Sequence, residues 1–112
     1  MHICHNVNMS KNIKRSETFL RFFLNSTNKQ QATIIQILTN DQILALAEIV
    51  KNLLQLSVSK KTKSILARKV RVANKLADSK TSLKERNRIL RKYHKHWIKL
   101  FMSVKDNLLT LL

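Results

Sequence analysis

Lysine and arginine recur at helical spacing along two stretches of the chain, and their charge is the clearest chemistry that the sequence offers. The intervals are seven, three and four residues in the first stretch and four, three, four and four in the second, which places each set on one helix face. The two sets are Lys61, Arg68, Arg71 and Lys75, and then Lys84, Arg88, Arg91, Lys95 and Lys99. Further basic residues widen the two faces: Lys60, Lys63, Lys69, Arg86 and Lys92. Faces of one sign favour phosphate binding, because a surface selected only for solubility would mix both signs.

The net charge of the chain also favours phosphate binding. Twenty-two lysines and arginines face six aspartates and glutamates, which gives +16 at pH 7 and a pI near 10.8. Sixteen of the basic residues and three of the acidic ones follow position 58, so the second part carries +13 and the first part +3. This asymmetry indicates that the C-terminal half is the interacting half and that its partner is a polyanion, with nucleic acid the expected one.

Helices are the elements that must position these charges. Glycine and proline are both absent, which removes the commonest helix breakers and argues against barrels and sandwiches rich in tight turns. Capping boxes begin at Thr27, Thr39 and Ser82, each followed three residues later by Gln or Glu. Ser16 and Ser59 can cap two further helices. We therefore expect helices over residues 16–25, 27–38, 39–55, 59–78 and 82–112.

Apolar residues follow the same period and supply a core. Those of the last expected helix lie seven apart and form an apolar seam away from its basic face. The seam consists of Leu83, Leu90, Trp97, Val104 and Leu111. The predicted fold is all-α, a small bundle of four to five helices joined by short connections. We expect a loose N-terminal arm over residues 1–15 and a single helical domain over residues 16–112, with its strongly basic part at 59–105.

Other groups of residues give weaker indications of a metal-binding or catalytic site. His2, Cys4 and His5 lack the fourth ligand that a structural zinc site needs, so neither a metal nor another cofactor is expected. The six carboxylates are scattered and no nucleophile is paired with an oriented base. We therefore expect neither an enzyme nor a small-molecule substrate.

Two patterns in the last expected helix have a binding and a packing interpretation. Residues 108–112 match the LxxLL pattern of helices that dock into grooves. Tyr93, Trp97 and Phe101 lie at intervals of four residues and could stack on the bases of a single strand. Both patterns coincide with the apolar seam, so core packing is the preferred interpretation of each.

Two segments carry a resemblance to a known family: LTNDQILALAEIVKNLL (Leu38–Leu54) and, after a link rich in Ser and Lys, KLADSKTSLKERNRIL (Lys75–Leu90). The stretch from Ile35 to Leu90 resembles small basic proteins encoded beside Maverick/Polinton-type DNA transposons and the related adintoviruses of invertebrates. Some members of that group resemble the adenovirus core protein X through an Arg-Gly-Gly segment, from which this glycine-free chain departs. The resemblance implies a virus- or transposon-derived helical protein that packages or coats DNA.

The expected function is binding of double-stranded DNA through backbone phosphates. We expect little sequence specificity, because the sequence contains no recognised motif that reads bases. One alternative is a structural or protein-interaction module that docks an acidic partner, with self-association through the C-terminal leucines. Another is an amphipathic protein at a membrane surface, which we rank lower because the other helices offer the basic helix an apolar partner. No apolar run reaches ~18–20 residues and the first residues are mostly polar, so we expect neither a transmembrane segment nor a signal peptide. The expected location is the nucleus or a virion, with the cytoplasm as the alternative.

Overall fold

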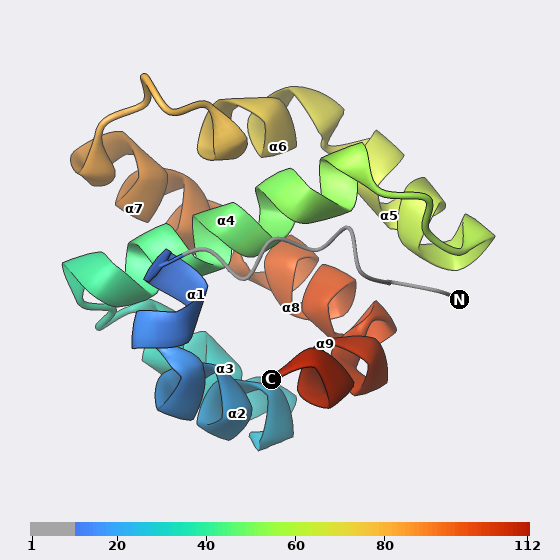
Figure 1. Ribbon diagram of the computed structural model, residues 1–112. Coiled ribbons are helices and arrows are strands. Elements are labelled where there is room, and N and C mark those ends of the chain that lie inside the picture. Colours follow the sequence, from blue (N-terminus) through green and yellow to red (C-terminus); the bar gives the residue numbers. More distant parts are fainter. Residues whose placement is uncertain (1–10) are drawn as a thin grey trace.

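The computed structural model describes residues 11–112, which form helices joined by short turns (Figure 1). The helices of this part are α1 (Lys11–Arg15), α2 (Glu17–Asn25), α3 (Asn28–Ile35), α4 (Asn40–Gln55), α5 (Lys60–Arg68), α6 (Val70–Ala77), α7 (Leu83–Lys92), α8 (His94–Ser103) and α9 (Lys105–Leu111). The prediction of an all-α fold is confirmed. The predicted number of four to five helices is wrong, because nine occur in residues 11–112.

The two strongly basic helices expected from the sequence are each interrupted, which accounts for most of this difference. Lys69 separates α5 from α6, whereas Tyr93 and Val104 separate α7, α8 and α9. A straight helix over residues 82–112 would be roughly 45 Å long, and the molecule measures only 31 × 29 × 27 Å. The last helix therefore has to bend for its apolar seam to stay covered along its whole length. Neither Gly nor Pro marks these bends in the sequence.

The predicted helix starts are mostly confirmed. Both hydrogen bonds of a capping box are present at Thr27 and at Thr39. At Ser82 and Ser59 the hydroxyl accepts from the N–H three residues later, so each caps its helix. Ser16 lies at the N-cap position of α2 as predicted, but the predicted side-chain cap is absent, because its hydroxyl donates to the carbonyl of Asp41 across 3.4 Å.

The predicted extent of the N-terminal arm is also wrong at its C-terminal end. Residues 11–15 form helix α1, which packs against α4. Ile13 is buried in the core, and Arg15 reaches within 3.6 Å of Asp41. A five-residue helix is too short to show a period in the sequence. The rest of the arm, with His2, Cys4 and His5, lies outside the described residues.

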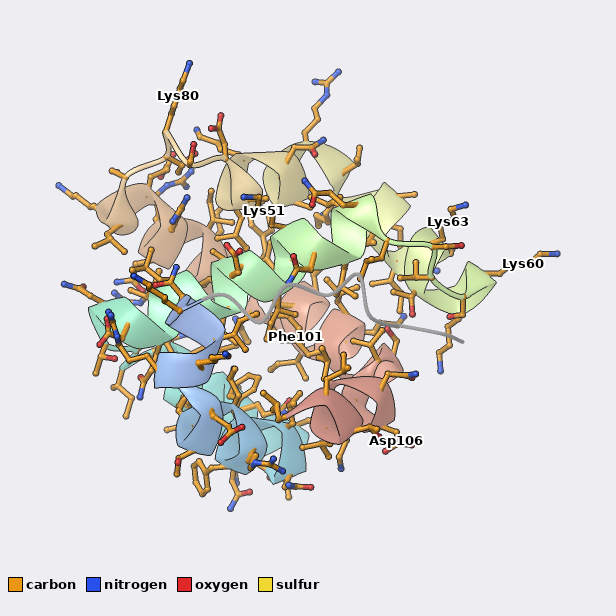
Figure 2. The ribbon with its side chains drawn as sticks, in the orientation of Figure 1. Lys51, Lys60, Lys63, Lys80, Phe101 and Asp106 are labelled. Atoms are coloured by element: carbon orange, nitrogen blue, oxygen red, sulfur yellow. The ribbon has the colours of Figure 1, made fainter. Side chains whose placement is uncertain are left out.

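Helix α4 crosses the middle of the molecule, between α1 on one side and α6 and α7 on another (Figure 1). Helix α8 packs against α3, α5 and α7 and brings the largest side chains into the core. Trp97 and Phe101 are fully buried, and Phe101 meets Phe23 edge to face at 6.0 Å; Figure 2 shows Phe101 pointing inward. The indole N–H of Trp97 donates to the carbonyl of Ile89 across 3.1 Å, which ties α8 to α7. This core fixes the helices that carry the basic residues.

Across residues 11–112, no single helix has the length and apolar character needed to cross a membrane. Helices α3 and α4 reach those values only when joined, and the chain bends by 120° between them.

Candidate nucleic-acid interface

The segment α5–α6 lies antiparallel to the segment α7–α8, and we call residues 60–103 the basic hairpin. Three contacts follow one another along it. The hydroxyls of Thr62 and Ser103 are 3.0 Å apart at one end. The Nζ atom of Lys69 lies 5.4 Å from the centre of the Tyr93 ring in the middle. Near the turn, Nζ of Lys75 lies 2.9 Å from Oε2 of Glu85. Sequence numbers rise along one arm as they fall along the other, so the two basic stretches lie side by side (Figure 1).

The basic residues nominated from the sequence all lie on this hairpin, and twelve of the fourteen are exposed. The exceptions are Lys69 and Arg86, which are partly buried. Side chains project at both ends of the hairpin: Lys60 and Lys63 extend from the first turn of α5, and Lys80 extends from the turn between α6 and α7 (Figure 2). The positive charge is therefore spread along the full length of the hairpin.

Glu85 neutralises part of this surface, which the sequence did not indicate. Its carboxylate binds Lys75 across the hairpin and Arg88 on its own helix. Hydrogen bonds from Arg88 and then Lys75 lower the pKa of Glu85 to about 2. Because the carboxylate is engaged in this way, it does not complete the capping box with Ser82. Lys75 and Arg88 are thus the two nominated residues whose charge is partly compensated, by one shared carboxylate.

The other twelve nominated residues form no ion pair with a carboxylate of the described chain. Two of them donate to neutral oxygens. Arg86 Nη2 lies 2.6 Å from the carbonyl oxygen of Asp78, and Arg91 Nε lies 3.2 Å from Oε1 of Gln36. Both bonds orient the guanidinium group without neutralising it. The hairpin is therefore a surface of largely uncompensated positive charge.

A dense group of these charges surrounds the point where both arms of the hairpin are interrupted. Lys69 lies between α5 and α6 and Lys92 is the last residue of α7, and the Nζ atom of each lies 5.4 Å from the centre of the Tyr93 ring. Burial lowers the pKa of the neighbouring His96, and the charges of Lys69, Arg68 and Lys99 lower that pKa further. We call this group the junction cluster; it comprises Arg68, Lys69, Lys92, Tyr93, His96 and Lys99. Its four cations were expected to bind phosphate, whereas Tyr93 was expected in the core and His96 was given no role, since nothing in the spacing brings the two interruptions together.

A shallow depression of about 600 Å³ runs along α7 beside this cluster. Four nominated residues line it, together with the capping Ser82, Glu85 and Asn87. These four are Lys84, Arg88, Arg91 and Lys92. Long basic side chains around an open depression can follow a phosphate backbone without enclosing a small molecule.

The LxxLL pattern and the aromatic residues of the last expected helix both pack in or against the core. Leu108 is buried, and Leu109, Leu111 and Leu112 are partly buried against the core. The fully buried rings of Trp97 and Phe101 are covered by protein atoms and offer no face to a base. No group of three or more His, Cys, Asp or Glu side chains with the geometry of a metal site occurs in residues 11–112.

Comparisons of the chain with protein-family models, with curated proteins and with solved structures returned no match. The resemblance to transposon- and adintovirus-encoded proteins therefore stays a prediction, and functional inference rests on the surface chemistry of the chain.

Proposed function

We propose that the protein binds nucleic acid through backbone phosphates, that double-stranded DNA is its partner, and that the basic hairpin is the binding surface. One observation carries this proposal: two adjacent antiparallel arms expose a large excess of positive charge. Among the nominated residues, only Lys75 and Arg88 pair with a carboxylate of residues 11–112. Each phosphate that such a surface contacts releases condensed counterions, and this release supplies sequence-independent affinity.

The choice of duplex over single strand follows from the placement of the aromatic rings. Proteins that bind single strands combine a basic groove with exposed rings on which bases stack. Trp97 and Phe101 are buried, and Tyr93 is partly buried with two lysines near its ring. A duplex needs no such platform, because its phosphates lie on the outside.

The size of the molecule sets the expected footprint. Its longest dimension is 31 Å, and duplex DNA rises 3.4 Å per base pair, so one molecule would cover roughly nine base pairs. Coating at about one protein per helical turn would suit packaging of viral or transposon DNA, the role that the resemblance implies. Binding without base contacts suits the same role, because packaging has to tolerate any sequence.

The proposal is tested with two triple variants that change the net charge equally. Lys61→Glu, Arg71→Glu and Lys95→Glu alter exposed residues of the hairpin, and the control alters the exposed Lys11, Lys14 and Lys29 in the same way. Affinity for a duplex of about two helical turns is measured by fluorescence anisotropy, with circular dichroism to verify helical content. We expect the hairpin variant to lose binding at moderate salt and the control to retain most of it. Equal losses would show that net charge alone attracts DNA, and would refute the hairpin as the surface.

The alternative partners are compared in the same assay. Vesicles of anionic lipid and an acidic polypeptide replace the duplex at the same ionic strength. Stronger binding to either than to DNA would favour the membrane or the acidic-protein alternative over the proposal.

A further inference from the structure

We propose that the junction cluster is the anchoring point of the basic hairpin and holds a single backbone phosphate of the bound duplex. This inference rests on the proposed function and deepens it, because it distinguishes one fixed phosphate site from a surface on which all the cations contribute alike.

Convergence of like charge is the first argument. Lys69 at the end of one arm segment and Lys92 at the end of another both place their Nζ atoms 5.4 Å from the same ring centre. Lys99 and Arg68 act on His96 from the same neighbourhood. None of these four cations pairs with a carboxylate in residues 11–112. Their mutual repulsion is unfavourable in the free protein, and a bound phosphate would replace it with attraction on several sides.

Preorganisation is the second argument. Lys69 is partly buried and occupies the interruption between α5 and α6, where its N–H donates to the carbonyl of Leu66 across 3.2 Å. The Tyr93 ring attracts the ammonium groups of both lysines, which restricts where these groups lie. A restricted lysine loses less conformational entropy on binding than a freely rotating one. Lys60 and Lys63, by contrast, are exposed and extend from the molecule (Figure 2).

The surroundings of His96 also support a phosphate site. Its Nε2 atom is buried and has no hydrogen-bond partner among the described residues. Its ring lies edge-on to Trp97 at 4.9 Å, so it is fixed against the core. Burial lowers the pKa of His96, and the nearby cations lower it further. A phosphate bound among those cations would offset their contribution and raise that pKa. The imidazole is therefore a local reporter of occupancy, distinct from the overall affinity.

Matched double variants test the anchor. Lys69→Gln with Lys92→Gln removes the pair beside Tyr93, and Lys60→Gln with Lys63→Gln removes the same charge from the end of α5. We expect the junction variant to weaken duplex binding about tenfold more than the end variant, with a salt dependence lowered by about one phosphate contact. If the wild-type protein binds the duplex and both double variants weaken that binding equally, the anchor is refuted and the proposed function is not.

A second measurement keeps the anchor testable if duplex binding itself fails or if the junction variant unfolds. Inorganic phosphate is titrated into the wild-type protein at constant ionic strength, and the His96 ring resonances are followed by NMR, assigned with a His96→Gln variant. We expect phosphate to raise the pKa of His96 more than chloride does, with no matching change at His94. A response that is the same for both anions would overturn the anchor. If wild-type protein binds no duplex yet phosphate raises the pKa of His96, the junction cluster is still a phosphate site, but the proposed function and the duplex as its ligand are refuted.

Discussion

The Nζ atom of Lys69 lies 5.4 Å from the centre of the Tyr93 ring, so the interruption of one basic arm lies against the interruption of the other. The arms stay in contact on both sides of this point, through Thr62 and Ser103 at one end and Lys75 and Glu85 near the turn. Two helices that bend at the same level can remain packed while following the curved core. The bends also gather cations that two straight helices would spread evenly along their length.

Removing the carboxylate of Glu85 should strengthen duplex binding. Glu85→Gln frees Lys75 and Arg88 for phosphates and removes one negative charge from the surface. We expect an increase of roughly threefold to tenfold in affinity, equivalent to about 1 kcal/mol, in anisotropy titrations. Asp106→Asn is the matched control, because Asp106 is exposed on α9 and directed away from the hairpin (Figure 2). An equal gain in both variants would contradict the specific role of Glu85.

Glu85 should also make the folded protein sensitive to acid. Its folded-state pKa of about 2 is below the ordinary value of 4.5, so its contribution to stability is complete above 4.5 and is lost as the pH falls towards 2. Thermal unfolding followed by circular dichroism across this window should show a smaller decline for Glu85→Gln than for the wild-type protein. Identical declines would mean that the ion pairs with Lys75 and Arg88 contribute nothing to folding.

His96 should destabilise the free protein below neutral pH. Its folded-state pKa is lowered from 6.5, so the unfolded chain takes up the proton more readily and stability falls as the pH drops through and below 6.5. His96→Gln should remove this part of the pH dependence, and His94→Gln should leave it in place. Denaturant midpoints measured above and below pH 6.5 test this prediction. A pH dependence of the midpoint that is the same in His96→Gln as in the wild-type protein would contradict it.

Of the side chains near the interruption between α7 and α8, Trp97 should lower the free energy of unfolding most when it is substituted. Trp97→Phe removes the hydrogen bond to the carbonyl of Ile89 and part of a fully buried ring, which should lower the free energy of unfolding by about 1–3 kcal/mol. Phe22→Leu is the control on an aromatic residue that is 62% exposed, and it should stay within about 0.5 kcal/mol of wild type. Equal effects in urea titrations would show that the indole does not hold the two helices together.

Local rules in the sequence predicted much of this fold. The capping boxes at Thr27 and Thr39 fix helix starts within a few residues, and the apolar period identified the buried faces of α4 and α8. The exposure of most nominated lysines and arginines followed from the same period. These features depend on neighbours within one or two helical turns, which a single sequence displays directly.

The features that sequence analysis missed depend on contacts between distant segments. The bends at Lys69 and Tyr93 have no glycine or proline to mark them, and the bend at Tyr93 divides a helix that would be longer than the molecule. The ion pair between Lys75 and Glu85 exists because the arms are antiparallel. Two of the three cations that act on His96, Arg68 and Lys69, come from the opposite arm for the same reason. Such relationships need the tertiary structure, and they define the junction cluster.

The salt dependence of duplex binding tests the proposed phosphate binding most directly. Binding constants of the wild-type protein for a duplex of arbitrary sequence are measured between about 50 and 200 mM salt. If six to ten side chains of the hairpin contact phosphates, the plot of log K against log salt should fall with a slope of roughly −5 to −9, and affinity should not depend on base sequence. A slope near zero, or no binding at the low-salt end, would contradict phosphate binding by the basic hairpin.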